Sequence, residues 1–166
     1  MRRNLHLIWR DLMFNSIVAS ILVPRGLRWR LLRLLGARVK RSSICAGMWL
    51  GSARLEIGES TFINYDCTID NSATVSIGAR CDIGRGVTIL TTNHEMASHR
   101  RRAGNAIHEP VSIGDGVWIG ANVTILPGVR IAEGAVIGAG AVVARDCESD
   151  AVYVGTPARL LRRLPA

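Results

Sequence analysis

The chain has 166 residues, of which 48% are hydrophobic, 20% charged and 5% aromatic, and its formal net charge at pH 7 is +8. Residues 1–41 contain ten Lys and Arg against a single Asp, which is +9, so the rest of the chain sums to −1. A nucleic-acid-binding surface combines cations with exposed aromatic rings. The chain after residue 41 has few aromatics and no such pattern, so we expect no nucleic-acid partner.

Residues 1–41 predict a basic, amphipathic helical cap. Apolar residues follow helical spacing between Leu5 and Ile17, and the run ends at Pro24, which breaks a helix. A second, shorter helical stripe follows in residues 27–35. The uncharged stretch 12–23 is too short to span a bilayer. Two interpretations remain open: the segment covers the first coil of the repeats that follow, or it lies on an anionic membrane. One segment could do both.

Residues 42–146 carry an apolar repeat with a period of six. The repeat runs through Ile57, Ile63, Ile69 and Val75, slips by two, resumes at Ile77, Ile83 and Ile89, and returns at Ile113, Ile119, Ile125, Ile131, Ile137 and Val143. Pairs such as Asp115-Gly116 and Pro127-Gly128 follow the apolar positions and suit turns with a positive φ. This period is typical of a β-solenoid whose coils are triangles of three short strands. We therefore predict an all-β, parallel β-helix.

Residues 91–110 interrupt the repeat with a polar, Arg-rich stretch that we expect to be a loop excursion. Long loops in a tightly wound scaffold are often functional. The excursion contains His94, close to the preceding strand. Acyl transfer to an alcohol needs a base whose pKa lies near the working pH, and histidine suits that role. His94 is therefore the candidate catalytic residue.

Three motifs in the C-terminal half resemble those of the hexapeptide-repeat acyltransferases. The residues that carry the resemblance are VSIGDGVWIG at 111–120, LPGV at 126–129 and GTPAR at 155–159. They are similar to the galactoside, maltose and exopolysaccharide O-acetyltransferases, and the resemblance covers roughly residues 44–163. It implies a left-handed parallel β-helix, a homotrimer, acetyl-CoA as the acyl donor, and an active site between neighbouring subunits.

The resemblance also implies roles on the acceptor side. His94 matches the catalytic histidine of the family, and Asn64 matches an asparagine near the oxyanion and the imidazole. Asp70 matches an acidic residue that hydrogen-bonds a sugar hydroxyl. Because the spacing before Ile77 differs by one residue from that of some relatives, Ser72 is an alternative counterpart. The expected acceptor is a saccharide hydroxyl.

On the donor side, the resemblance implies CoA contacts in the coils and in a C-terminal tail, residues 147–166, that completes the site. The matching residues are Trp118, Ala121, Ala139, Ala144, Arg145, Arg159 and Arg162. For Trp118, on an outward face, a contact with a neighbouring subunit is an equal alternative to a contact with the pantetheine arm. The alanines leave backbone groups open to the amide-rich pantetheine arm, and the arginines supply the cations that a diphosphate needs. A threonine is common in the family where this chain has Ala144.

The histidines also raise a metal-dependent alternative, because some hexapeptide solenoids are zinc- or iron-dependent carbonic anhydrases. His94 and His99 lie five residues apart, but such a site needs three imidazoles, one of them on a preceding coil. The remaining histidines, His6 and His108, lie in the N-terminal segment and at the end of the excursion. We therefore expect no metal requirement.

The cysteines bear on the cellular setting. Cys45, Cys67, Cys81 and Cys147 show no paired metal spacing and follow no secretory leader. Cys67 and Cys81 occupy repeat positions that take small apolar residues. We therefore expect a reduced, cytoplasmic protein, with peripheral contact at the inner face of the membrane as a variant.

Together these features predict an acetyl-CoA-dependent O-acetyltransferase in which His94 assists direct transfer to a saccharide hydroxyl. An N-acetyltransferase or an antibiotic-modifying acetyltransferase of the same fold is the first alternative. A carbonic-anhydrase-like protein and a non-catalytic solenoid scaffold are the others. The scaffold would explain the repeat, but not the single excursion that carries a histidine.

Overall fold

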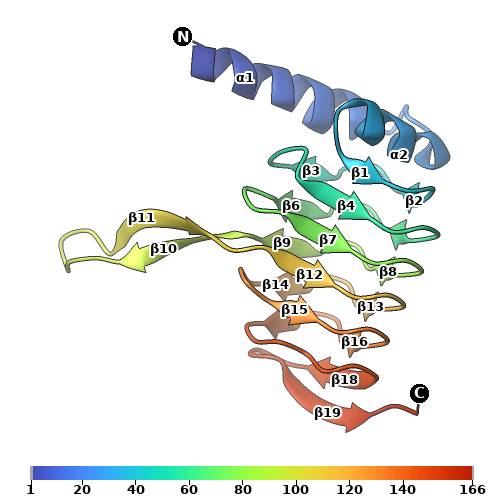
Figure 1. Cartoon of the computed structure of the whole chain (residues 1–166), viewed down its shortest axis with the longest axis vertical. Coiled ribbons are helices and arrows are strands. Elements are labelled where there is room, and N and C mark those ends of the chain that lie inside the picture. The colour runs from blue at the N-terminus through green and yellow to red at the C-terminus, as the bar shows by residue number, and fades with distance from the viewer. Residues whose placement is uncertain (1, 166) are drawn as a thin grey trace.

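The computed structural model describes the backbone of residues 2–165 and the side chains of residue 5 and of residues 7–165. Short strands stack in coils along one axis, as Figure 1 shows. Helices lie across the N-terminal end of the stack, and a two-stranded hairpin projects from its side. The parallel β-helix expected from the six-residue period is confirmed.

Three sheets form the faces of the solenoid, and within each sheet strands of successive coils pair in parallel. Sheet 1 contains β1 (Arg38–Val39), β4 (Leu55–Ile57), β7 (Val75–Ile77), β12 (Val111–Ile113) and β15 (Arg130–Ile131). Sheet 2 contains β2 (Ser43–Ile44), β5 (Phe62–Ile63), β8 (Asp82–Ile83), β13 (Trp118–Ile119), β16 (Val136–Ile137), β18 (Ala151–Val154) and the antiparallel β19 (Arg159–Arg163). Sheet 3 contains β3 (Trp49–Leu50), β6 (Thr68–Asp70), β9 (Thr88–Leu90), β14 (Thr124–Ile125) and β17 (Val142–Val143).

The core is a set of apolar columns along the axis. In sheet 2, Ile63, Ile83, Ile119 and Ile137 pair in register on successive coils, and all four are at most 2% exposed. Burying an isoleucine side chain stabilises a fold by about 1.5–3 kcal/mol. The apolar residue of each six-residue unit therefore holds one coil to the next.

The corners between sheets 1 and 2 (the 1–2 corner) and between sheets 2 and 3 (the 2–3 corner) repeat one turn on successive coils. Gly116 and Gly134 have positive φ at the 1–2 corner, as Asn122 and Gly140 do at the 2–3 corner. Glycine and asparagine tolerate this conformation best. The turns expected from the pairs in the repeat are confirmed.

The corner between sheets 3 and 1 (the 3–1 corner) is where coils gain residues. From Ile44 to Val143 the inward-facing residues are six apart, except at three steps across this corner in the upper coils. These steps are seven residues from Leu50 to Ile57, eight from Ile69 to Ile77 and 24 from Ile89 to Ile113. The slip seen in the sequence period is the second of these insertions. The excursion is the third, so all three belong to one edge of the solenoid.

The N-terminal helical segment is also confirmed. It consists of α1 (Arg2–Arg10), the π-helical η1 (Asp11–Val18), which continues α1, and α2 (Arg25–Leu34). The first solenoid strand, β1, begins at Arg38, inside the stretch 1–41 assigned to the cap. Within the described chain, no helix combines the length and apolarity needed to cross a bilayer.

The cap is fastened to the first coil by its inner face. Phe14 and Val18 are only 3% and 2% exposed. The Asn15 side chain accepts a hydrogen bond from the Leu50 backbone N–H (2.8 Å) and donates to the Leu50 carbonyl (3.2 Å). Since β3 has no preceding strand to pair with, these bonds satisfy part of its free edge.

A buried arginine joins the two helical parts to the solenoid. The side chain of Arg28 is 1% exposed and its guanidinium donates to four backbone carbonyls. The distances are 2.6 Å to Val18, 2.5 Å to Ile44, and 2.7 Å to both Ser20 and Val23. Because Arg28 contacts the end of η1, the interhelical turn and β2 together, it fixes the cap on the first coil.

Candidate active site

The excursion is an antiparallel hairpin rather than the expected loop. β10 (Thr92–Met96) and β11 (Ala103–His108) pair with each other and extend away from the coils, as Figure 1 shows. We call residues 91–110 the arm. Most of its side chains on both faces are exposed, so it lacks the apolar alternation by which a strand is recognised in sequence.

His94 lies in the first strand of the arm, opposite Ala106. Its Nδ1 is 3.1 Å from the carbonyl oxygen of Gly104. A carbonyl oxygen can only accept, so this hydrogen bond requires a proton on Nδ1. The neutral imidazole then carries its lone pair on Nε2, and that atom is free to take a proton from a substrate.

Polar groups predicted for the acceptor side lie where the arm leaves the solenoid. Asp70 ends β6 and pairs with Leu90, the last residue of β9 before the arm. Its carboxylate accepts a hydrogen bond from the Ser72 hydroxyl (2.9 Å), and its backbone carbonyl accepts one from the buried Thr91 hydroxyl (2.7 Å). Asp70 and Ser72, the two alternatives for the same role, thus form one hydrogen-bonded pair at the 3–1 corner.

Asn64 lies at the 2–3 corner, away from the root of the arm. With Trp118, which is 59% exposed, it lines a shallow hollow of about 300 Å³ on sheet 2. The Asn64 side-chain oxygen accepts a hydrogen bond from the Tyr65 N–H (2.8 Å), while its amide nitrogen has no partner among the described residues. One protomer therefore places Asn64 and His94 at different corners.

The predicted donor residues Ala121 and Ala139 occupy the 2–3 corner on successive coils. A Cβ added at Gly120 would lie only 2.5 Å from the Ala139 backbone nitrogen, and one added at Gly84 would lie 2.6 Å from that of Ala121. The coils approach closely at this corner, so the small residues here also have a packing reason.

The predicted phosphate-binding arginines lie near the C-terminal end. Arg145 and Arg159 line a common hollow of about 160 Å³, and Ala144 directly precedes Arg145. Arg162 lies farther along β19, opposite Val152, and does not line this hollow. None of these three arginines forms an ion pair with another described residue. Two cations are thus available to one anionic group.

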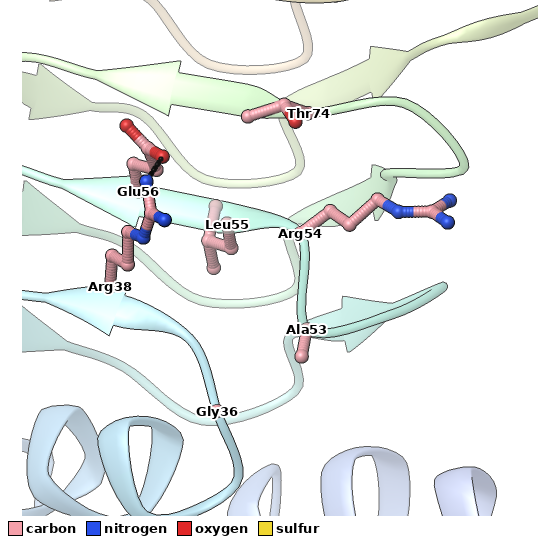
Figure 2. A pocket seen from close by; sticks show the side chains of 7 residues that line it. All are labelled: Gly36, Arg38, Ala53, Arg54, Leu55, Glu56 and Thr74. Atoms are coloured by element: carbon pink, nitrogen blue, oxygen red, sulfur yellow. Dashed lines mark hydrogen bonds and ion pairs between the residues drawn. The ribbon is translucent and has the colours of Figure 1, made fainter.

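Another hollow, of about 240 Å³, contains none of the predicted site residues. Figure 2 shows it on sheet 1, beside the end of α2. Arg38 forms an ion pair with Glu56 across its edge at 3.0 Å, and Arg54 donates to the Ser72 carbonyl. Both cations already have partners within the chain.

Two residues that contact the candidate site residues were not predicted from the sequence. Gly104 orients His94, and Thr91 ties the root of the arm to Asp70. Nothing in the sequence links Gly104 to His94, because their contact depends on the antiparallel pairing of the arm.

The described part of the chain also bears on metal binding and on thiol chemistry. No cluster of three or more His, Cys, Asp or Glu that could hold a metal ion occurs there. The cysteines Cys45, Cys67, Cys81 and Cys147 are free and buried. Burial raises the pKa of the Cys67 and Cys147 thiols to about 11, so both stay protonated near neutral pH.

Comparison with known proteins identifies relatives of this chain. Residues 110–145 match the family model described as bacterial transferase hexapeptide (six repeats). The chain is 43% identical over 106 residues to nodulation protein L of Rhizobium meliloti, covering 64% of this chain and 58% of the relative. It is 37% identical over 112 residues to galactoside O-acetyltransferase of Escherichia coli, covering 68% and 55%. The matched region thus spans a little over half of the length of these two curated relatives.

Similarity to a solved structure extends over nearly the whole chain. A hexapeptide-repeat acetyltransferase from Vibrio cholerae, crystallised with acetyl coenzyme A, is 32% identical with a TM-score of 0.85. The match covers 95% of this chain and 86% of that one. The shared coils and the sequence identity agree: the chain belongs to the hexapeptide-repeat acetyltransferases.

Proposed function

We propose that this protein is an O-acetyltransferase that transfers the acetyl group of acetyl-CoA to a saccharide hydroxyl. The observation that carries the proposal is the imidazole of His94, whose Nδ1–H is bound to the Gly104 carbonyl at 3.1 Å. This bond leaves Nε2 as the basic atom. A base of this kind is what an alcohol needs in order to attack a thioester.

In the proposed reaction, Nε2 of His94 removes the proton from the acceptor hydroxyl while the acceptor oxygen bonds to the thioester carbonyl carbon. The tetrahedral intermediate collapses as the carbon–sulfur bond breaks, and His94 returns the proton to the CoA thiolate. The products are the acetyl ester and the CoA thiol. The hydrogen bond to Gly104 holds the imidazole in one tautomer and stabilises its protonated form.

The proposed acceptor and donor roles rest on the chemistry of the other predicted residues. Asp70, paired with Ser72, can accept a hydrogen bond from a sugar hydroxyl. The free amide N–H groups of Asn64 can donate to the oxyanion. Arg145 and Arg159 can bind CoA phosphates at their shared hollow.

We also infer that the active form is a homotrimer with shared sites. His94, Asp70 and Arg145 belong to the 3–1 corner, whereas Asn64 and Trp118 belong to the 2–3 corner or its adjoining face. Contact between the 3–1 corner of one subunit and the 2–3 corner of its neighbour would unite them. Three copies can close such a head-to-tail interface into a ring.

Acetyl transfer is tested by following CoA thiol release with acetyl-CoA and a panel of glycosides and amino sugars. We expect release that depends on a glycoside and gives an alkali-labile acetyl ester, and release that is slower by about a hundredfold or more with His94→Ala. Release only with an amino sugar, giving an amide, would show an N-acetyltransferase instead. Wild-type protein that transfers no acetyl group to any acceptor in the panel would contradict the proposal.

The shared site is tested by co-expressing two inactive variants. His94→Ala and Asn64→Ala alter different corners, so their mixed trimers contain sites with both residues intact, and activity should return. His94→Ala with Asp70→Ala is the matched control, because both residues belong to one corner and every site then lacks one of them. A fully active monomer in light scattering would overturn the trimer.

The free thiols bear on the compartment. The four cysteines are buried and unpaired, and we infer from them a reducing, cytoplasmic setting for the enzyme. Labelling of cell fractions with an antibody to the protein would check this location.

A further inference from the structure

The outer side of the cap exposes more large apolar side chains than its packing needs. Leu5, Ile8 and Leu12 are 61%, 63% and 50% exposed. Their spacing of three and four residues places them along one side of α1 and its continuation into η1. Ile21 and Leu22, in the turn that follows, are 83% and 87% exposed. With Trp9, which is 47% exposed, we call these residues the apical surface.

The apical surface is not part of the fold's own core. The cap is held to the first coil by other groups, namely Phe14, Val18, the Asn15 side chain and the guanidinium of Arg28. In Figure 1, α1 crosses the N-terminal end of the solenoid, so its outer side faces away from the coils. An exposed apolar group of this size is typical of an interaction site.

The charge at this end of the molecule indicates the partner. Residues 1–41 carry +9, and the exposed arginines Arg25, Arg30 and Arg33 all lie on α2. The only acidic residue of the segment, Asp11, is paired with Arg10 at 2.6 Å. The rest of the chain sums to −1, so the cations are concentrated at this end of the molecule.

Apolar side chains, a tryptophan and unneutralised arginines together match the interface of an anionic bilayer. The apolar residues enter the boundary between headgroups and acyl chains, and the arginines attract acidic headgroups. A second copy is a poorer match, because joining two such ends would bring two strongly positive segments together. We propose that the cap binds the surface of anionic membranes, with α1 lying parallel to the bilayer.

Vesicle co-sedimentation tests this proposal without acetyl-CoA or an acceptor. The full-length protein is mixed with vesicles of phosphatidylcholine, with and without phosphatidylglycerol, at low and high salt. We expect binding only to the anionic vesicles, weakened by salt because screening reduces the electrostatic part. The Arg25→Gln/Arg30→Gln variant should bind more weakly by roughly tenfold or more, since each arginine near the surface contributes about fivefold.

The apolar part is tested by Leu5→Ser/Ile8→Ser, which should reduce partitioning by on the order of tenfold. Both side chains are mostly exposed, so the fold should persist, and circular dichroism checks this. Met96→Ser/Leu161→Ser is the control, because these residues are 93% and 61% exposed elsewhere on the molecule. Arg100→Gln/Arg101→Gln on the arm controls for the loss of two charges.

Normal binding by both controls and weak binding by both cap variants would support the proposal. Wild-type protein that ignores anionic vesicles, or cap variants that bind as well as the controls, would overturn it. If the wild type ignores vesicles and Leu5→Ser/Ile8→Ser reduces its mass in light scattering, another copy of the chain covers the apical surface. None of these outcomes depends on acetyl transfer.

Discussion

The chain turns differently at the 3–1 corner of the solenoid than at the other two corners. At the 1–2 and 2–3 corners most coils turn through one residue of positive φ, such as Gly116 or Asn122. At the 3–1 corner the upper coils insert residues, and buried polar side chains such as Asn71 and Thr91, both 0% exposed, replace the compact turn. The regular corners therefore build the scaffold, and the irregular corner gives rise to the arm that carries His94.

The largest effect that would sharpen this comparison is the loss of the proposed base, His94, on the irregular corner. His94→Ala should lower kcat by about 10²–10⁴. Because His94 is exposed, its loss creates no core cavity, and the melting temperature should stay close to that of the wild type. Steady-state kinetics and thermal unfolding measure the two quantities.

His99→Ala and His108→Ala serve as controls for the other arm histidines. His99 lies in the connection between the two arm strands, and His108 Nδ1 lies 3.1 Å from the Thr92 hydroxyl at the base of the arm. Both variants should retain most activity. A fully active His94→Ala enzyme would break the link between the irregular corner and catalysis.

The next effect concerns what holds the irregular corner together. The Asn71 side chain accepts a hydrogen bond from the Ser52 N–H (2.7 Å) and donates to the Ser52 carbonyl (2.8 Å). Asn71→Ala would leave these backbone groups unpaired in a buried place, and we expect the free energy of unfolding to fall by about 2–4 kcal/mol. Urea unfolding at one fixed protein concentration measures the change.

Asn122→Gly is the matched substitution at a regular corner. Asn122 has φ of 56° and no side-chain hydrogen bond with a described residue. Glycine adopts this φ freely, so the change in unfolding free energy should stay within about 0.5 kcal/mol. Equal losses in Asn71→Ala and Asn122→Gly would mean that the corners do not differ in how they are stabilised.

A smaller effect is expected at the donor end. Arg159→Gln should raise the KM for acetyl-CoA about tenfold with little change in kcat, because phosphate binding is the same in the ground and transition states. Arg163→Gln, four residues along the same strand, is the control, since Arg163 is paired with Glu148 at 2.6 Å. If both variants raise the KM equally, general charge rather than a specific contact binds the donor.

The smallest expected change tests whether the regular corners stay closed around their cysteines. Cys67 and Cys81 follow turns at these corners and are each 1% exposed, and burial raises the pKa of both thiols. Thiol reagent at pH 8 should therefore label the native protein hardly at all and all four cysteines after unfolding. Rapid labelling of the native protein would show that these corners open.

The solenoid could be predicted from sequence because one local rule repeats. Each inward isoleucine is followed by a turn pair, and the residues that bury it lie at a fixed spacing along the chain. Ile119 and Ile137 are therefore buried in the same way. The slip before Ile77 marked an insertion without indicating that it shares an edge with the arm. That relation becomes visible only when the sheets are stacked.

The candidate site was predictable by residue type and family pattern but not by geometry. His94 and Asp70 fall on one edge, whereas Asn64 falls on another, and nothing in the sequence pattern indicated this division. The arm was expected to be a loop because its strands face solvent on both sides. For the same reason the hydrogen bond from His94 to Gly104 could not be foreseen.

The final strand gives the solenoid a defined number of coils. In a stack of parallel coils, the last coil exposes unpaired strand edges to which a further coil can pair. β19 occupies that edge in sheet 2. It pairs antiparallel with β18, so no further parallel coil can add to this edge of the sheet. The cap covers the other end of the solenoid. The number of coils can therefore change only by duplication or loss of coils between the two ends. A duplicated 18-residue coil, such as the step from Ile119 to Ile137, would lengthen the molecule and leave both ends as they are.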